Sequence, residues 1–180
     1  MTDIHITATS NVTEADARAA RLGQRFGRMD LASQLALLAV ENLRVPFETL
    51  ARERIGICLV STAGSLATDA DYWNSRLAAG GPSPTLFTYT LPSAPLGEIA
   101  IRFQLTGPNL CFVGDDRLAL SEGLEMLRRD EADGCVCVAC DVVNEGVAAL
   151  TGTPPTASAW ASYLQRGTAG APAQGSLAVT

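Results

Sequence analysis

The sequence lacks several features that would place it in common functional classes. It has no apolar run long enough to span a bilayer, and Met1-Thr2-Asp3-Ile4-His5 has no signal-peptide pattern. We therefore expect a soluble, cytoplasmic protein. Its 13 basic residues against 19 acidic ones include no large basic cluster, which argues against nucleic acid as a partner. The turn Ala63-Gly64-Ser65 lacks the spacing of a phosphate-binding loop, and we expect no cofactor.

Histidine is also scarce, since His5 is the only one, and this limits both metal and acid–base chemistry. The five cysteines are odd in number and lie in apolar segments, which favours buried free thiols over disulfides. On a strand, Cys135 and Cys137 would point to one face and Cys140 to the other. We therefore expect core packing and no metal site at these thiols.

What is present is the pattern of an α/β protein of one main domain. Asp30 is a good N-cap for an apolar helix over residues 31–43, and residues 54–62 read as a strand buried on both faces. We expect further strands and helices at the positions listed here: strands over 4–9, 109–114, 134–143 and, weakly, 157–164; helices over 69–79, 96–105 and 117–129; an extended loop over 85–93. Trp73 and Trp160 are expected to be packing anchors.

The most informative segment runs from Gly107 to Leu118. It combines a Gly-Pro turn, a short apolar strand, and a helix that opens behind Asp115 and Asp116. Either aspartate could cap this helix, because a carboxylate is stabilised at a helix N-terminus.

Several motifs in this order resemble the N-terminal half of a β-ketoacyl-acyl carrier protein synthase. They are Arg28-Met29-Asp30, Arg54-Ile55-Gly56-Ile57 before Ser61-Thr62-Ala63-Gly64, the segment 83–100, Gly107-Pro108-Asn109, and Ala132-Asp133-Gly134-Cys135-Val136. Details such as Gly114-Asp115-Asp116 and Val136-Cys137-Val138-Ala139-Cys140-Asp141 are similar to short chain-length-factor-like proteins of aryl polyene and related lipid pathways.

The resemblance implies half of a thiolase fold, with a mixed sheet of about five strands covered by helices. It places this domain over residues 1–165 and leaves residues 166–180 as a loose tail with a possible short edge strand. It also implies a ketosynthase partner and chains bound to acyl carrier protein.

The same resemblance points to missing chemistry. In the family the nucleophilic cysteine lies eight residues after the proline of the Gly-Pro turn, and here that position is Asp116. The catalytic histidines come from the family's C-terminal half, and His5 lies on the wrong strand to replace them. We therefore expect no catalytic residue and no catalytic activity of this chain alone.

Two surface features follow from the sequence. In the full fold of the resembling family, the helix after the third strand is buried between two sheets. Here that helix carries a polar face, which predicts that this face is exposed to solvent and that no second half covers it. The strand before it becomes an apolar sheet edge, and the resemblance implies pairing across a dimer axis. The interface candidates are Leu110, Cys111, Phe112 and Val113, with a ketosynthase subunit or a second copy as the partner.

Three functional hypotheses remain open at this stage. The first is a non-catalytic, chain-length-factor-like partner in carrier-protein-dependent fatty acid, polyketide or aryl polyene synthesis. The second is an acyl-transfer or hydrolytic enzyme that uses Asp116 or Cys111. The third is a structural homodimer with no role in acyl chemistry.

Overall fold

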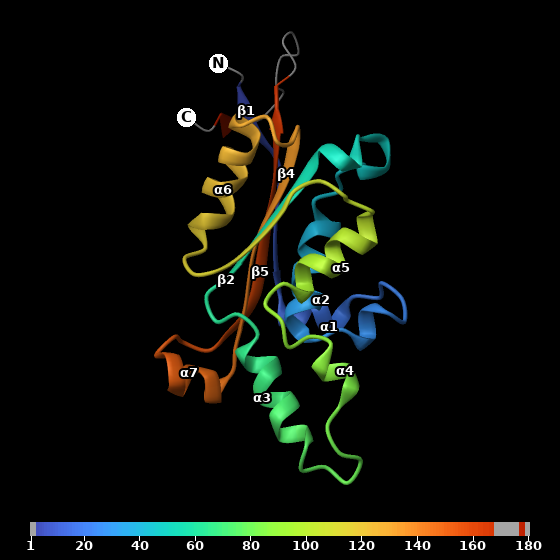
Figure 1. Cartoon of the computed structure of the whole chain (residues 1–180), viewed down its shortest axis with the longest axis vertical. Coiled ribbons are helices and arrows are strands. Elements are labelled where there is room, and N and C mark those ends of the chain that lie inside the picture. Colours follow the sequence, from blue (N-terminus) through green and yellow to red (C-terminus); the bar gives the residue numbers. More distant parts are fainter. Residues whose placement is uncertain (1–2, 168–176, 179–180) are drawn as a thin grey trace.

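A mixed β-sheet forms the centre of the molecule (Figure 1). The computed structural model describes residues 3–167 and 177–178. The strand order is β3-β2-β4-β5-β1-β6; β3, β2 and β4 are parallel, and β5 and β1 continue the sheet antiparallel. The strands are β1 (Ile4–Thr13), β2 (Ile55–Ser61), β3 (Asn109–Val113), β4 (Gly134–Val143), β5 (Thr156–Arg166) and β6 (Leu177–Ala178). The expected mixed α/β sheet is confirmed.

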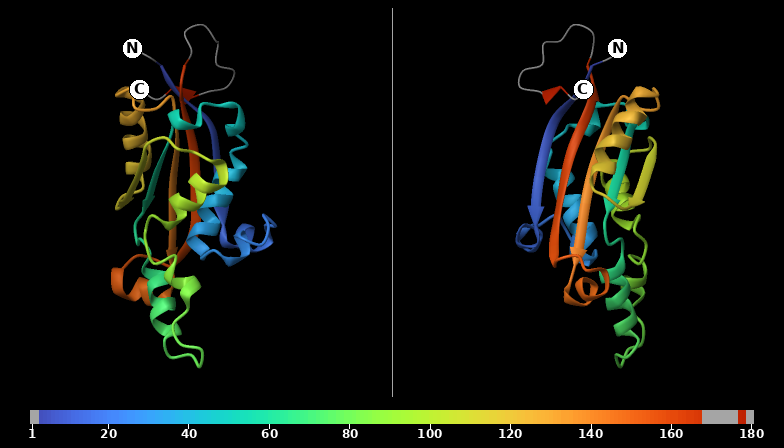
Figure 2. Two further views of the ribbon diagram at one scale, coloured as in Figure 1. Left: turned by 45° about the vertical axis from the view of Figure 1, so that its right-hand side comes forward. Right: turned by 90° about the vertical axis from the view of Figure 1, so that its left-hand side faces the viewer.

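Helices cover the two faces of this sheet unequally (Figure 2). One face carries α1, α2 and α5, whereas α6 alone packs on the other face of β2 and β4. The helices are α1 (Glu14–Ala19), α2 (Leu31–Asn42), α3 (Leu66–Ser75), α4 (Pro84–Phe87), α5 (Ala94–Phe103), α6 (Arg117–Arg128) and α7 (Glu145–Thr151). None of the helices in the described residues is long and apolar enough to cross a membrane.

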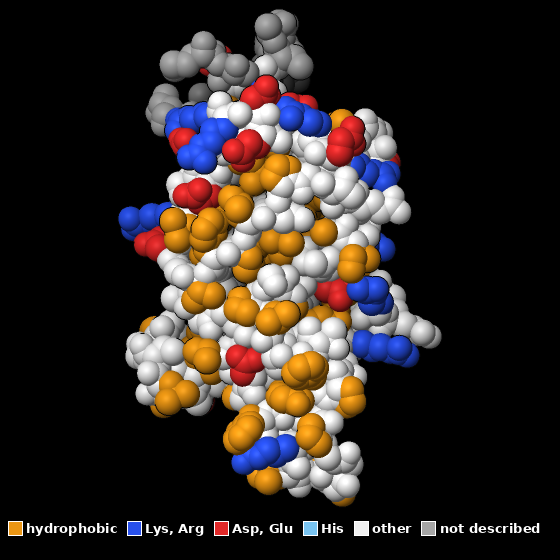
Figure 3. Space-filling view, viewed as in Figure 1, with side chains coloured by type: hydrophobic (Ala, Val, Ile, Leu, Met, Phe, Trp, Pro, Cys, Tyr) orange, Lys and Arg blue, Asp and Glu red, His pale blue; other side chains and the backbone are white. Residues whose placement is uncertain are grey.

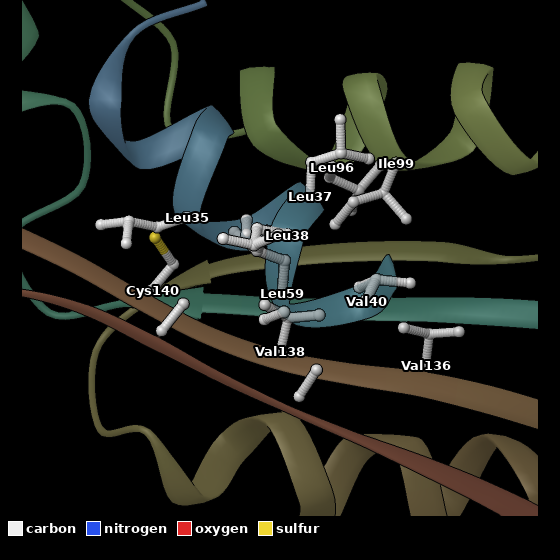
Figure 4. Packing of buried hydrophobic residues seen from close by; sticks show 14 of the residues in the cluster. Leu35, Leu37, Leu38, Val40, Leu59, Leu96, Ile99, Val136, Val138 and Cys140 are labelled. Atoms are coloured by element: carbon white, nitrogen blue, oxygen red, sulfur yellow. The ribbon is translucent and has the colours of Figure 1, made fainter. Parts of the chain in front are cut away.

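The larger core lies between α2, α5 and the sheet (Figure 4). The Asp30 carboxylate accepts a hydrogen bond from the Ser33 amide at 3.0 Å, so the predicted N-cap is confirmed. Its second oxygen accepts from the Thr68 hydroxyl at 2.6 Å, which ties α3 to the start of α2. Behind this cap, Leu35 and Ala39 are fully buried against the sheet. The cap and the apolar stripe together hold α2 in place on β4 and β5.

The strand β2 is buried along its whole length, as its nearly continuous apolar sequence predicted. Ile57 and Leu59 face the core under α2, while Cys58 and Val60 face α6. A strand buried on both faces anchors its neighbours, so β2 sets the position of β3 on one side and β4 on the other.

Several local expectations were wrong. The stretch 85–93 is not wholly extended, because α4 begins at Pro84, where the Ser83 hydroxyl accepts from the Leu86 amide. Proline at the first helical position favours such a start. The helix α3 begins three residues and ends four residues earlier than predicted. The helix α7 was not expected; it follows Asn144, whose side chain accepts from the Val147 amide at 3.0 Å.

The segment from Gly64 to Pro92, called the arm below, contains α3 and α4 and projects beyond the end of the sheet (Figures 1 and 2). At the opposite end of the molecule, β5 runs to Arg166, and β6 lies within the predicted tail. Residues 168–176 and 179–180 lie outside the described residues, so the domain boundary at residue 165 stays a prediction.

Candidate functional site

The turn Gly107-Pro108 leads into β3 and lies against the start of β2. A Cβ atom at Gly107 would lie 2.3 Å from the carbonyl oxygen of Ile55 and 2.7 Å from its carbonyl carbon. Only glycine therefore allows the chain to cross the start of β2 so closely. The Pro108 carbonyl then accepts from the Ile57 amide at 2.9 Å, which starts the parallel pairing of β3 with β2.

The strand β3 lies at an open edge of the sheet. Its pairing with β2 ends where the Gly114 amide donates to the Ser61 carbonyl at 3.0 Å. Because peptide groups alternate in direction along a strand, the N–H and C=O groups of Asn109, Cys111 and Val113 point away from β2. No strand pairs with this edge in the part of the chain that the structure describes.

The interface candidates on β3 are unequally exposed. Leu110 and Phe112 are half-buried against the α6 core, Cys111 is half-buried on the other face, and the Val113 side chain is 59% exposed. The apolar edge predicted from the sequence is therefore present, with backbone groups and one aliphatic side chain open to a partner.

The junction after β3 holds two exposed carboxylates. Asp115, rather than Asp116, uses its side chain at the helix start, accepting from the Arg117 amide at 2.9 Å. Asp116 occupies the N-cap position with helical dihedral angles, and its carboxylate makes no capping bond. The Asp116 carboxylate is thus exposed at the start of α6 without capping the helix. The capping expectation is correct for Asp115 and wrong for the Asp116 side chain.

The cysteines near this junction do not present a reactive thiol. Cys111 lies in the middle of β3, and burial raises the pKa of its thiol. Cys58 lies on β2 under the first turn of α6, with its Sγ 3.8 Å from the Leu118 carbonyl oxygen. Burial raises the pKa of Cys58 to about 12, so this thiol is protonated at neutral pH. A protonated, enclosed thiol is a poor nucleophile.

The remaining thiols serve the core. Cys135 and Cys137 lie under α6 with their sulfur atoms 3.9 Å apart, whereas Cys140 faces α2 and donates to the Ala32 carbonyl. The pKa of the Cys137 thiol is raised by its hydrogen bond with the Cys135 thiol and by burial. Among the described residues, no three histidine, cysteine or acidic side chains come together as a metal site.

These thiols predict a loss of stability in alkali. In the unfolded chain a cysteine titrates near its ordinary pKa of 9.0, whereas folded Cys58 keeps its proton to about 12. Between these pH values the folded state binds more protons, so stability falls as pH rises, by roughly 1 kcal/mol per pH unit for each such group. Tyr163, whose pKa burial raises to about 12, acts in the same direction above pH 10.0. Melting temperatures measured from pH 8 to 11 should fall, and Cys58→Ala should flatten the slope. An unchanged slope in Cys58→Ala would contradict the assignment.

His5 lies at the other end of the sheet. It pairs with Gln165, which in turn pairs with Gly134 at the start of β4. Asp116 follows the carboxyl end of β3, which runs parallel to β4 through β2. The structure therefore does not bring His5 and Asp116 together.

Asp141, at the carboxyl ends of the parallel strands β2 and β4, has a structural role that could not be predicted from the sequence. Its Oδ1 accepts from the Thr62 amide at 2.7 Å, the Ser61 hydroxyl at 3.0 Å and the Ala63 amide at 3.2 Å. Its Oδ2 accepts from the Thr62 hydroxyl at 3.0 Å. One carboxylate thus fixes the turn that leads from β2 into the arm.

Two small cavities lie on the α2 side of the sheet. One, of about 10 Å³, lies beside Ser61 and Tyr89 and has room for about one water. The other, of about 70 Å³, lies between α2 and α5, beside a buried Glu98 that pairs with Arg25 at 2.8 Å. Asp116 lines neither of these two cavities.

The outer face of α6 is polar, as predicted. Arg117, Arg128 and Arg129 are exposed on it, and Arg128 pairs with Glu125 at 2.9 Å. The inner face buries Ala119, Gly123, Met126 and Leu127. Gly123 is required there, because a Cβ atom would lie 2.4 Å from the sulfur of Cys137.

Comparisons with known proteins identify this fold. The sequence matches no protein-family model and no curated protein sequence. Solved structures are similar: the ishigamide ketosynthase/chain length factor (20% identity, TM-score 0.72) and a type II polyketide synthase ketosynthase, AntDE, in complex with its acyl-carrier protein AntF (16%, 0.75). A third is the complex of the ketosynthase ApeO with its chain length factor ApeC from Xenorhabdus doucetiae (17%, 0.66).

The extent of these matches defines what the chain contains. It is covered to 91%, 92% and 92%, while it spans 62%, 63% and 79% of the respective matched chains. The chain thus spans less than two thirds of the first two relatives. Its fold is that of one part of a ketosynthase-type protein, which confirms the thiolase half-fold expected from the sequence.

Proposed function

We propose that this chain is a non-catalytic, chain-length-factor-like subunit that pairs with an active ketosynthase. The observation that carries the proposal is the junction of β3 and α6, which keeps a ketosynthase-like scaffold and presents the Asp116 carboxylate where the thiol is expected. A condensing reaction needs a thiolate to hold the acyl chain and donors to stabilise oxyanions. The active partner would supply both.

The open edge of β3 supports the pairing. An unpaired strand edge with apolar side chains is a template for another strand, and solved proteins with this fold include a ketosynthase in complex with its chain length factor. The proposed pathway is carrier-protein-dependent synthesis of a fatty acid, polyketide or aryl polyene, with acyl carrier protein as a second partner of the complex. The five free thiols favour a reducing compartment, which fits a cytoplasmic location.

The enzymatic alternative gains no support from the geometry. The thiol of Cys111 lies on the sheet edge with a raised pKa, and the only histidine is remote from Asp116. The homodimer alternative differs from the proposal in its partner, a second copy of the chain, and in having no role in acyl chemistry. A binding experiment can therefore separate the two.

Co-expression with a full-length ketosynthase from the same genome tests the proposal. We expect a stable heteromeric complex by sedimentation, with slowed amide exchange at Cys111 and Val113, whose N–H groups point to the open edge. With malonyl-acyl carrier protein, the isolated chain should show no decarboxylation and no acyl-enzyme mass shift. Either activity in the isolated chain would overturn the non-catalytic assignment, and self-association without ketosynthase binding would favour the homodimer.

A further inference from the structure

The arm carries an apolar surface that the described chain leaves largely exposed. Trp73 is 61% exposed, Leu77 78%, Phe87 61% and Leu91 62%. Trp73 is therefore not the packing anchor expected from the sequence, whereas Trp160 packs partly against the α6 core. Figure 3 shows hydrophobic side chains gathered over the arm at the lower end of this face. Patches of exposed aromatic and aliphatic side chains mark interaction sites in soluble proteins.

This surface continues to the open edge of β3. A Cβ atom at Gly64 would lie 3.4 Å both from a Pro92 side-chain carbon and from a Val113 methyl group. The base of the arm therefore lies beside the exposed end of β3. A protein that pairs with β3 and extends past Val113 would come to lie on the arm.

The size of β3 requires such an extension. The strand has five residues, and a contact of that length buries far less than the roughly 800 Å² per partner of a stable complex. Toward α6 the neighbouring surface carries the exposed Arg117, Arg128 and Arg129. Toward the arm, beyond the exposed carboxylates of Asp115 and Asp116, it carries mainly exposed apolar side chains and few charges, which is typical of the core of an interface.

The aromatic side chains of the arm make contacts within the arm itself. The guanidinium carbon of Arg76 lies 3.7 Å from the ring centroid of Trp73, and the rings of Tyr72 and Phe87 lie 5.4 Å apart. Tryptophan, like tyrosine and arginine, is enriched among the few residues that dominate binding energy. Holding it in the free protein lowers the entropy lost on association.

We propose that the arm is the second contact surface for the ketosynthase subunit that pairs with β3, with Trp73 and Leu77 as its anchors. This inference rests on the proposed function. It divides the interface into a strand contact at β3 and a side-chain contact at the arm. Strand pairing alone would accept many partners, so the arm would distinguish one ketosynthase from another.

The test compares arm variants with a matched control in the co-expressed complex. Trp73→Ala and Leu77→Ala should each raise the Kd for the ketosynthase about tenfold or more, with melting temperatures unchanged because both side chains are exposed. Leu150→Ala, which removes an aliphatic side chain that is 83% exposed on α7, should leave the Kd unchanged. Amide exchange of the wild-type complex should show protection of α3 as well as β3.

The outcomes separate the two claims. Failure of the wild-type chain to bind the ketosynthase would overturn the proposed function and this inference together. Wild-type binding that Trp73→Ala and Leu77→Ala do not weaken, or that Leu150→Ala weakens equally, would overturn only the role of the arm. Loss of self-association in the arm variants would instead assign the surface to a second copy. Binding of the isolated chain to phosphatidylcholine–phosphatidylglycerol vesicles, abolished by Trp73→Ala, would assign it to a lipid surface.

Discussion

Replacing Gly107 by alanine is expected to destabilise the protein by about 3 kcal/mol, because the added methyl group would overlap the backbone of Ile55. Its Cβ atom would lie 2.3 Å from the Ile55 carbonyl oxygen and 3.0 Å from the Ile55 nitrogen. Backbone cannot rotate away as a flexible side chain can, so β3 must shift relative to β2. For a domain of this size the melting temperature should fall by roughly 6–12 °C.

Gly97→Ala is the matched control for this change. Gly97 lies within α5, and a Cβ atom there would meet nothing within 4 Å. Alanine should therefore stabilise the helix by about 0.5–1 kcal/mol. Thermal melts of the two variants should move in opposite directions. A Gly107→Ala protein as stable as the wild type would show that the crossing over β2 is looser than the distances indicate.

The consequence of Gly107→Ala for assembly follows from its position. The turn sets where β3 begins to pair with β2, and therefore the register of the two strands. The positions of the free N–H and C=O groups of Cys111 and Val113 depend on that register. A shifted β3 presents a displaced edge to the partner. Ketosynthase binding should therefore weaken in Gly107→Ala even at temperatures where the variant remains folded.

Much of this fold could be predicted from the sequence because local chemistry specified it. Asp30 before an apolar helical stripe predicted α2 and its cap, and the unbroken apolar run predicted β2 as a buried strand. The alternation of Cys135, Cys137 and Cys140 predicted two opposite faces, and they occupy two separate cores. In each case the deciding contacts lie within a few residues or follow from strand geometry.

The errors arose where a local pattern has two outcomes. The prolines around residues 85–93 favour an extended loop, although a serine cap followed by proline, here Ser83-Pro84, also starts a helix, as it does in α4. Asp115 and Asp116 are both good caps, and only the backbone dihedral angles after β3 decide which side chain reaches an amide. Trp73 suits a core, but the arm carries it beyond the sheet.

Asp141 shows a further limit of local reasoning. Its partners lie about 80 residues away in sequence, and only the parallel pairing of β2 with β4 brings them together. The carboxyl ends of parallel strands meet at one edge, which is why polar side chains there find each other. From the sequence this residue marked only the approximate end of a strand. In the structure it holds the base of the arm.

Asp141→Ala is therefore expected to cost about 2–4 kcal/mol of stability, since it removes the acceptor of four hydrogen bonds at once. Two of the donors are the backbone amides of Thr62 and Ala63, and Ala63 is buried. A buried amide that loses its acceptor retains the full cost of its desolvation. Chemical denaturation measures the loss, and exchange of the Ala63 amide should accelerate.

Asp141→Asn separates the hydrogen bonds from the charge. Its amide oxygen can keep accepting from the Thr62 and Ala63 amides, so it should lose only about 1 kcal/mol. The side chain of residue 141 does not belong to the proposed contact surface, but the turn that it holds leads into α3. The alanine variant should therefore weaken ketosynthase binding more than the asparagine variant does. Equal effects of the two substitutions on binding would show that the negative charge, and not the position of the arm, governs association.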